Sequence, residues 1–371
     1  MACGPQERQR HTVKLLVLGG GAQGRVIAAD LARSLPASAV TVVDVHRPEL
    51  PALPNLAFVE ADLSSVTVAA RLIAGCDLAV GALPSHLGYG GMQAAIEAKR
   101  PLVDVSFCAE DPLSLDAAAR TAGIAILPDC GLAPGLSHLA VGHAAGPSAA
   151  SGTPDEVMIY VGGVAQDRTR PYGYVITWSL DDLEQEYLRP ARIVEGGAPK
   201  TVPVFSGLET ISIDGAGEME AFYSDGLRTL IDTLPGVPRM GEKTLRWPGH
   251  VEAVRPLVDS GRFLAEFRAR CTSDAPHDLV AMLVCVRHGE REQRMTLVDR
   301  YDAATRMTAM SRTTALTTSA VAQFAAAGGV RSRGVLPLER VGPDAIAYDF
   351  ITGGLARHGI RLTWSERAVP V

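Results

Sequence analysis

Three glycines near the start of the chain constrain its fold more than any other feature. They stand at G-x-G-x-x-G spacing, as Gly19, Gly21 and Gly24. An apolar, β-rich run over residues 13–18 precedes them, and residues 22–35 carry apolar side chains at helical spacing until Pro36. Because glycine clusters mark many turns, the motif indicates a dinucleotide site only in such a strand–turn–helix context. That context is present, so the sequence predicts a dinucleotide-binding unit.

Each residue of this unit has a predicted role. Gly19 permits the tight turn, Gly21 lets the backbone approach a pyrophosphate, and Gly24 allows close packing of the helix on the strand. The helix N-terminus, with Ala22 and Gln23, offers free N–H groups and a positive dipole to the phosphates. These five residues are therefore assigned to cofactor binding.

The cofactor preference depends on Asp44, which ends the second predicted strand, 20 residues after Gly24. A carboxylate at this place accepts hydrogen bonds from the adenosine ribose hydroxyls and repels a 2′-phosphate. We therefore expect NAD as the cofactor. His46 and Arg47, which follow closely, weaken that preference and leave NADP open.

The alternation of strands and helices continues to about residue 131. Buried strands are predicted over 13–18, 39–45, 56–65, 76–84, 100–106 and 123–131. Parallel strands linked by helices place a ligand at their carboxyl ends. There we assign Asp62 to the adenine, with a helix N-cap as its alternative role, and Ala82, Leu83 and Pro84 to the cofactor. The predicted fold is α/β, a Rossmann-type doubly wound parallel sheet.

Past residue 150 the pattern changes. The small and polar stretch 144–156 predicts a domain crossing, and strands then outnumber helices. Strands are predicted over 156–163, 173–179, 219–224, 243–249, 277–289 and 293–302, and helices over 180–188, 225–234, 310–329 and 343–359. We expect a mixed α+β domain for substrate binding and dimerisation. The expected bounds are 12–150 for the Rossmann domain, 151–305 for the substrate domain and 306–371 for a C-terminal helical segment that returns to the first.

Composition restricts the partners and the compartment. The chain of 371 residues has a net charge of −6 and no basic block, which argues against nucleic acid and anionic membranes. Its first residues lack the apolar core of a secretory signal, and no apolar run reaches membrane-spanning length. The six cysteines, from Cys3 to Cys285, form no C-x-x-C pair, and no H-x-x-x-H is present. We expect a cytoplasmic protein without a disulfide framework or a metal site.

Several stretches resemble the saccharopine dehydrogenase superfamily. The resemblance is carried by PDCGLAPGLSHLAVGHA (128–144), WSLDDLEQEY (178–187), EAFYSDGLRTL (220–230), KTLRWPGH (243–250) and MSRTTALTTSAVAQ (310–323). The A-P-G and T-L-R-W-P-G-H blocks are fairly specific to it, and the likeness runs from about residue 13 to 340. Within the superfamily these stretches are most similar to the bacterial L-lysine 6-dehydrogenases.

The resemblance implies an NAD(P)-dependent oxidoreductase that acts on a C–N bond of an amino acid. For the lysine 6-dehydrogenases, the implied reaction converts the ε-amino group of L-lysine to allysine or piperideine-6-carboxylate and releases ammonia. Two alternatives remain open: a saccharopine or carboxynorspermidine dehydrogenase, and a non-catalytic NAD(P)-sensing protein. A homodimer is expected, because symmetric oligomers are common among such enzymes.

The reacting amine must be neutral, whereas a free ε-ammonium has a pKa of about 10.4. A base or burial must therefore remove a proton. The candidates are Asp104 and Asp129, which follow predicted strands, and His250 as a proton shuttle. Each has an alternative role: Asp104 as a capping acid, Asp129 as the start of a Pro-Asp turn, and His250 as a structural donor.

The substrate carboxylate needs a charged partner. Arg246 is the candidate because its planar guanidinium suits a carboxylate, with a surface ion pair as the alternative. Strand alternation puts Lys243 on the opposite face. Further substrate contacts are expected from Tyr174, Trp178 and Tyr223 along the aliphatic chain, and from a helix start at Pro134 and Gly135. A substrate with several carboxylates would also use arginines from the set Arg168, Arg170, Arg189 and Arg192.

Overall fold

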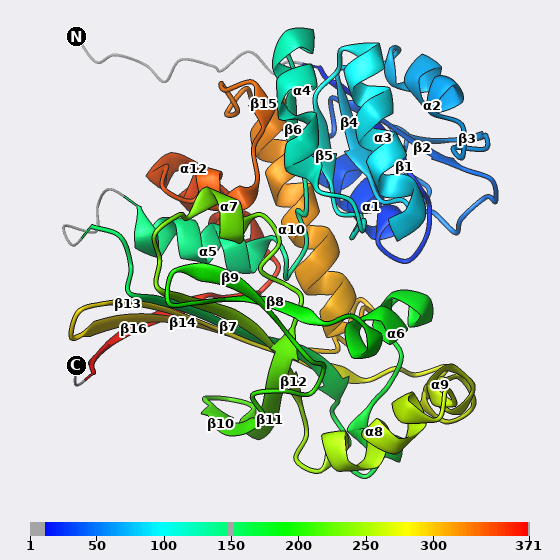
Figure 1. The fold of residues 1–371 in the computed structure, drawn as a ribbon. Coiled ribbons are helices and arrows are strands. Elements are labelled where there is room, and N and C mark those ends of the chain that lie inside the picture. Colours follow the sequence, from blue (N-terminus) through cyan, green and yellow to red (C-terminus); the bar gives the residue numbers. More distant parts are fainter. Residues whose placement is uncertain (1–11, 147–151, 370–371) are drawn as a thin grey trace, which may run out of the picture.

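The structure is a computed structural model that describes residues 12–146 and 152–369. Cys3, most of the polar lead and part of the expected crossing at 144–156 lie outside the described residues. Two lobes are visible, each built on its own β-sheet (Figure 1). None of the helices in the described ranges is both long and apolar enough to cross a lipid bilayer.

The first lobe contains a seven-stranded parallel sheet in the order β15-β6-β5-β4-β1-β2-β3. Its strands are β1 (Lys14–Leu18), β2 (Ala39–Asp44), β3 (Leu56–Glu60), β4 (Leu78–Gly81), β5 (Leu102–Asp104), β6 (Ala125–Leu127) and β15 (Gly334–Val335). The strand order reverses between β1 and β4, which opens a crevice at their carboxyl ends. The predicted doubly wound sheet is confirmed.

Helices cover both faces of this sheet. α1 (Gly24–Ser34) packs on one face, and the other is covered by α2 (Val66–Ile73), α3 (Ser85–Ala98) and α4 (Asp116–Ala122), with η1 (Pro112–Leu115) before α4. Successive side chains of β1 point to opposite faces. Val17 therefore packs with Leu31 of α1, whereas Leu16 belongs to a separate core with Met92 of α3.

The second lobe is built on a nine-stranded mixed sheet. Its main path is β10-β11-β12-β7-β13-β14-β16, and β8 pairs with both β12 and β9. The strands are β7 (Glu156–Ala165), β8 (Ala191–Glu195), β9 (Ala198–Val202), β10 (Glu209–Ile213), β11 (Gly217–Ser224), β12 (Arg239–Arg246), β13 (Asp278–His288), β14 (Arg291–Arg300) and β16 (Thr363–Ala368). β7 and β12 run parallel, and their other pairings are antiparallel. This confirms the expected mixed sheet.

The helices of the second lobe lie around this sheet (Figure 1). They are α5 (Leu136–Ala145), α6 (Leu180–Leu188), α7 (Leu230–Thr233), α8 (His250–Asp259), α9 (Phe263–Cys271), α11 (Leu338–Val341) and α12 (Ala345–Arg357). α6 has the predicted bounds, and the Ser179 hydroxyl caps it by accepting from the Asp182 N–H at 3.2 Å. Apolar side chains of α6, α8 and α9 form their own cluster beside the sheet, with aromatic rings from α6 and α9.

One long helix, α10 (Ala309–Ala326), connects the two lobes. Figure 1 shows it in orange, running from the second lobe along the first. The Asp278 carboxylate of β13 accepts from the Ala309 and Met310 N–H groups at 2.6 and 2.9 Å, which fixes the start of the helix. Further along, α10 packs on α1 within a core that also includes Val280 of β13. This shared core holds the lobes together. After α10 the chain adds β15 to the first sheet and β16 to the second, and neither strand was predicted.

Two predicted elements of the second lobe are wrong. The strand predicted over 173–179 does not form: η2 (Pro171–Gly173) takes up its first residue, and Tyr172 and Gly173 turn the chain with φ of 58° and 59°. Of the helix predicted over 225–234, only α7 forms, because Arg228 has φ of 47° and its side chain is bound to the first lobe. Both departures depend on contacts or turns that local periodicity does not contain.

Candidate functional site

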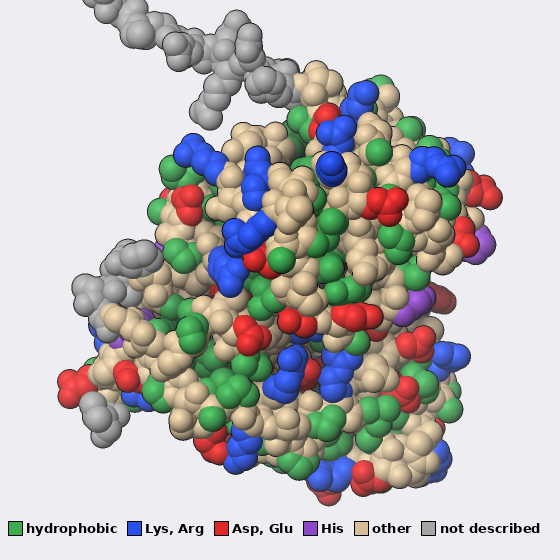
Figure 2. Space-filling view, turned by 45° about the horizontal axis from the view of Figure 1, so that its top comes forward, with side chains coloured by type: hydrophobic (Ala, Val, Ile, Leu, Met, Phe, Trp, Pro, Cys, Tyr) green, Lys and Arg blue, Asp and Glu red, His purple; other side chains and the backbone are tan. Residues whose placement is uncertain are grey.

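A cavity of about 1030 Å³ lies between the lobes. The first lobe contributes the segments after β1 to β6, around the crevice where the strand order reverses. The second lobe contributes β7, β12 and α6. Figure 2 shows acidic and basic side chains close together along the band where the lobes meet. The Ser85 hydroxyl donates to Asp182 of α6 at 2.7 Å, so the wall of the cavity contains a direct contact between the lobes.

The end of the cavity next to the first lobe contains nearly all of the predicted cofactor residues. Those that line it are Gly19, Gly21, Ala22, Gln23, Asp44, Asp62, Ala82, Leu83 and Pro84. A Cβ on Gly21 would meet nothing within 4 Å, so this glycine leaves open space beside the backbone. Gly24 does not line the cavity. A Cβ there would overlap the Gly19 carbonyl oxygen, so Gly24 serves close packing of the helix on the loop.

Asp44 is positioned by the glycine loop itself. Its Oδ2 accepts from the Gly20 N–H at 2.7 Å, and its Oδ1 accepts from the His46 N–H at 3.0 Å. The carboxylate is half-buried at the edge of the cavity. The loop, the open side of Gly21 and this acid together fit a dinucleotide, with the pyrophosphate at the start of α1 and the ribose at Asp44.

The opposite end of the cavity is formed by one face of β12. Glu242, Thr244 and Arg246 line it, whereas Lys243 points to the other face and contacts Glu209 at 2.6 Å. Strand alternation explains this division. The Arg246 guanidinium is buried and already bonded: Nη2 donates to both Glu186 oxygens at 3.2 Å, Nε to the Tyr187 hydroxyl at 2.7 Å, and Nη1 to a backbone carbonyl.

Carboxylates outnumber arginines on the side of the cavity formed by the second lobe. The acids are Asp182, Glu186, Asp225, Glu242 and Asp274, and the arginines are Arg189, Arg246 and Arg306. Glu186 contacts Arg246, and Asp225 contacts Arg192 at 2.8 Å and Arg189 at 3.9 Å. Glu242 is different: its side chain is buried and its Oε2 has no hydrogen-bond partner in the described structure. Burial, followed by the charges of Glu186 and Asp225, raises the pKa of Glu242 to about 8.

Some of the predicted substrate-binding residues line the cavity and others do not. Arg246, Tyr174, Trp178 and Pro134 line the cavity, and the Trp178 indole donates to the Tyr174 hydroxyl at 3.0 Å. Tyr223 lies on the opposite face of the sheet, because it pairs with Lys243 in register, and Lys243 Nζ lies 4.6 Å from the centroid of its ring. Gly135 turns the chain before α5 with φ of 131° and does not line the cavity.

The three predicted catalytic residues lie behind the cavity wall. Asp104 is fully buried and accepts from the N–H and hydroxyl of Ser106, which does line the cavity. Burial raises the pKa of Asp104 to about 7, against the lowering effect of the Ser106 hydrogen bonds. His250 is enclosed between the Tyr187 hydroxyl and the Tyr172 carbonyl, each at 2.7 Å, and burial lowers its pKa to about 3. These contacts are with the protein rather than with the cavity.

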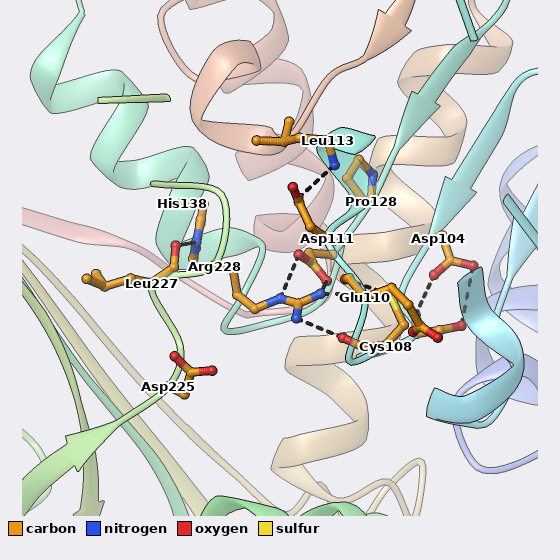
Figure 3. A network of polar contacts seen from close by, with 12 residues as sticks. Asp104, Cys108, Glu110, Asp111, Leu113, Pro128, His138, Asp225, Leu227 and Arg228 are labelled. Carbon is orange, nitrogen blue, oxygen red and sulfur yellow. Dashed lines mark hydrogen bonds and ion pairs between the residues drawn. The ribbon is translucent and has the colours of Figure 1, made fainter. Parts of the chain in front are cut away.

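Asp129 is bound by Arg228, whose network of polar contacts joins the lobes (Figure 3). Arg228 donates through Nε and Nη2 to the two Asp129 oxygens at 3.2 and 3.3 Å, and through Nη1 to the Cys108 carbonyl at 2.7 Å. Its guanidinium also lies 4.9 Å from the ring centroid of Phe107, a residue of the cavity wall. Both partners have positive φ, 54° for Asp129 and 47° for Arg228. The pair therefore fixes the loop after β5 against the second lobe.

The sequence predictions missed the acids of the second lobe and Arg228. A signal for Glu242 was present, because residues 242, 244 and 246 share one face of a strand. Glu186 lies on α6 and Asp225 follows β11, so only the folded structure brings them to the same wall as Glu242. No cluster of three or more metal-binding side chains was found in the described ranges.

Comparisons with known proteins match the chain in two parts, one for each end of the cavity. A family model described as the saccharopine dehydrogenase NADP binding domain matches residues 15–127, and one described as the saccharopine dehydrogenase C-terminal domain matches residues 131–360. The first model covers the glycine loop, Asp44 and the strand ends that line the cavity. The cofactor is therefore a nicotinamide dinucleotide.

Curated relatives and a solved structure are also similar to the chain. Saccharopine dehydrogenase (NADP(+), L-glutamate-forming) of Pyricularia oryzae is 31% identical over 212 residues, which cover 52% of this chain and 45% of the relative. The enzyme of the same name from Saccharomyces cerevisiae is 26% identical over 208 residues, which cover 54% and 47%. The chain thus spans about half the length of the curated relatives it matches. The apo saccharopine dehydrogenase (L-Glu forming) structure from S. cerevisiae has a TM-score of 0.74 at 18% identity, over 96% of this chain and 100% of that chain.

Proposed function

Because the chain belongs to the saccharopine dehydrogenase family, we propose that it is a nicotinamide-dependent oxidoreductase that acts on a C–N bond of an amino acid. The amino acid of this proposal is L-lysine, and the reacting bond is the one to its ε-nitrogen. The family is the one predicted from the sequence motifs. In the proposed reaction, L-lysine, NAD⁺ and water give allysine, ammonium, NADH and a proton, and allysine cyclises to piperideine-6-carboxylate with loss of water. The bound nicotinamide supplies the acceptor for the hydride.

The choice of L-lysine as substrate rests on the charged side chains that line the cavity. Five carboxylates and three arginines line its second-lobe side, and Arg246 is already paired with Glu186. The buried Glu242 carboxyl is left over. A buried unpaired acid favours a cationic ligand, because an ammonium group would satisfy its oxygen and its charge. L-Lysine has such a group at the end of an aliphatic chain, for which Tyr174 and Trp178 offer an apolar wall.

Arg189 and Arg246 have different roles in this proposal. Arg189 lies 3.9 Å from Asp225, too far for a hydrogen bond, so its guanidinium can turn to the substrate carboxylate. Arg246 and the Thr244 hydroxyl both donate to Glu186. In this proposal they fix the position of the Glu186 carboxylate in the cavity wall. In this proposal the carboxylate-binding role predicted for Arg246 passes to Arg189, the residue directly after α6.

Saccharopine is the second candidate, because the curated relatives carry its name. It has three carboxylates, and four further arginines were proposed above to receive them. Of these, only Arg189 lines the cavity. Arg168 stacks on Trp247 at 3.8 Å, Arg170 donates to Ser273, and Arg192 pairs with Asp225. This distribution favours the substrate with one carboxylate.

Asp44 is expected to set a preference for NAD over NADP. In the variant Asp44→Ala, the affinity for NAD should fall by about 1.5–3 kcal/mol, roughly 10–150-fold, since hydrogen bonds to a charged group are lost. The affinity for NADP should fall less or rise, because the carboxylate no longer repels the 2′-phosphate. Calorimetric titration of both cofactors into the wild type and the variant measures the ratio. An unchanged ratio would remove Asp44 from the ribose site.

A substrate panel tests the proposed reaction. L-Lysine, L-ornithine, saccharopine and carboxynorspermidine are each incubated with NAD and with NADP, and the reduced cofactor is followed by its absorbance. We expect turnover with L-lysine, together with release of ammonia. Turnover with saccharopine alone would make the second candidate the function. Cofactor binding without turnover of any panel member would instead support the non-catalytic sensing protein.

A further inference from the structure

Glu242 occupies a distinctive place in the cavity. It lies on β12 between strands β7 and β11, on the same face as Thr244 and Arg246. Only 5% of its surface is exposed, and its carboxyl lies against Gly226, where any Cβ would overlap it. Because the opposing residue is a glycine, the backbone makes room for the acid. Its Oε2 nevertheless has no hydrogen-bond partner in the part of the chain that the structure describes.

The charged groups around Glu242 are already matched with one another. Glu186 of α6 accepts from Arg246 and from the Thr244 hydroxyl. Asp225, which follows β11, pairs with Arg192 at 2.8 Å and has Arg189 at 3.9 Å. Both neighbouring acids therefore have an arginine partner, whereas the buried Glu242 carboxyl has no ion pair in the described structure. Leaving a buried acid in this state is costly to the folded protein, which indicates that a ligand completes the arrangement.

The proposed reaction needs a carboxylate that can accept a proton from the substrate ammonium. An ammonium nitrogen has no free electron pair, so its carbon cannot give up a hydride until a proton has left the nitrogen. At neutral pH nearly all of a free ε-amine is protonated, with a pKa of about 10.4. A carboxylate that contacts the ammonium can take the proton. The N–H bond then breaks, nitrogen keeps the electron pair, and the proton bonds to a carboxylate oxygen, so that –NH₃⁺ and –COO⁻ become –NH₂ and –COOH.

We propose that Glu242 is the proton acceptor for the substrate ammonium and forms the subsite that selects a primary amine. The inference rests on the proposed function and names the group within that site. The ammonium of the substrate is the partner that Oε2 lacks. Asp104, Asp129 and His250 have protein partners and lie behind the wall, so none of them competes for this role.

Amine binding can be tested without turnover. n-Pentylamine carries the ammonium and the chain but no carboxylate, and it is titrated calorimetrically into the NADH complex at pH 7. Two buffers of different ionisation enthalpy report the protons released. Since Glu242 is largely protonated at this pH and a cation drives its ionisation, wild type should release close to one proton. In Glu242→Gln we expect at least tenfold weaker binding and no release. Glu252→Gln, an exposed acid of α8, is the matched control and should behave as wild type.

Equal affinity and equal proton release in Glu242→Gln and wild type would overturn the proposal, and so would failure of wild type to bind n-pentylamine. These outcomes are independent of the substrate panel, which can fail while the amine subsite is present.

The pH profile of turnover gives the second readout. With L-lysine, kcat/KM should rise tenfold per pH unit up to about 8 and then level off, because Glu242 must be ionised to accept a proton. Glu242→Gln should lose this limb and at least about 100-fold in kcat, within the usual range for a general base. Glu242→Asp, which keeps a carboxyl, should restore the limb with part of the rate. A Glu242→Gln enzyme with the wild-type profile would overturn the proposal.

Discussion

Replacement of Arg228 with alanine is expected to lower the free energy of unfolding by about 3–5 kcal/mol, because it leaves the Asp129 carboxylate buried without its partner. Both side chains are almost fully buried, at 3% and 4% exposure. The variant should also lose activity, since the guanidinium holds the Cys108 carbonyl and the ring of Phe107 in the cavity wall. Urea unfolding, followed by circular dichroism, measures the first effect.

Arg192→Ala is the matched control for this variant. Arg192 pairs with Asp225, an acid of its own lobe, and the arginine side chain is 45% exposed, against 9% for the acid. Because the arginine is half exposed to solvent, this pair is screened far more than the Arg228–Asp129 pair, and Arg192→Ala should cost at most about 1 kcal/mol. Asp129→Asn breaks the buried pair from the other side, and its loss should not add to that of Arg228→Ala. Additive losses, or equal stability of the Arg228 and Arg192 variants, would show that the buried pair does not join the lobes.

Gly24 and Gly21 are expected to respond differently to alanine. A Cβ at position 24 would overlap the Gly19 carbonyl oxygen and lie 3.4 Å from the Ala82 Cβ. Gly24→Ala should therefore push α1 away from the loop, cost about 1–3 kcal/mol in stability, and weaken cofactor binding at the same time. A Cβ at position 21 meets nothing within 4 Å in the protein, so Gly21→Ala should keep the wild-type stability.

Affinity for the cofactor is the second quantity on which the Gly21 and Gly24 variants are compared. If the pyrophosphate lies against the backbone at Gly21, a methyl group there reduces affinity for NADH by about 10–100-fold, or 1.4–2.8 kcal/mol. Thermal unfolding of the apoprotein and fluorescence titration with NADH measure the two quantities on the same samples. Full cofactor affinity in Gly21→Ala would place the pyrophosphate elsewhere. Wild-type stability in Gly24→Ala would contradict the packing role of that glycine.

The first lobe could be predicted almost completely from its sequence. Its signals are local: buried β-rich runs, helical spacing between them, glycines at fixed offsets and Asp44 at the next strand end. The cavity-lining residues Ala82, Leu83 and Pro84 also follow from local order, since they come directly after a buried strand. Here each residue's position is fixed by the element to which it belongs.

The site in the second lobe was harder to predict because distant residues build it. Glu186, Asp225 and Glu242 lie on α6, after β11 and on β12, and only the folded sheet brings them to one wall. Tyr223 and Glu242 show why the register of the strands matters. Tyr223 was assigned to the cavity and Glu242 was overlooked, although strand alternation places Glu242 on the same face of β12 as Arg246. Arg228 is a further case, since its contacts with the first lobe override the helical pattern of 225–234.

The origin of the transferred hydrogen tests the central claim most directly. The protein is incubated with NAD and either L-lysine deuterated at C6 or L-lysine deuterated at C2, and the reduced cofactor is analysed by mass spectrometry. We predict that deuterium appears in the cofactor from the C6-labelled substrate and not from the C2-labelled one, with trapped allysine as the product. Label from C2, or reduced cofactor formed only when saccharopine replaces L-lysine, would contradict oxidation at the ε-amine.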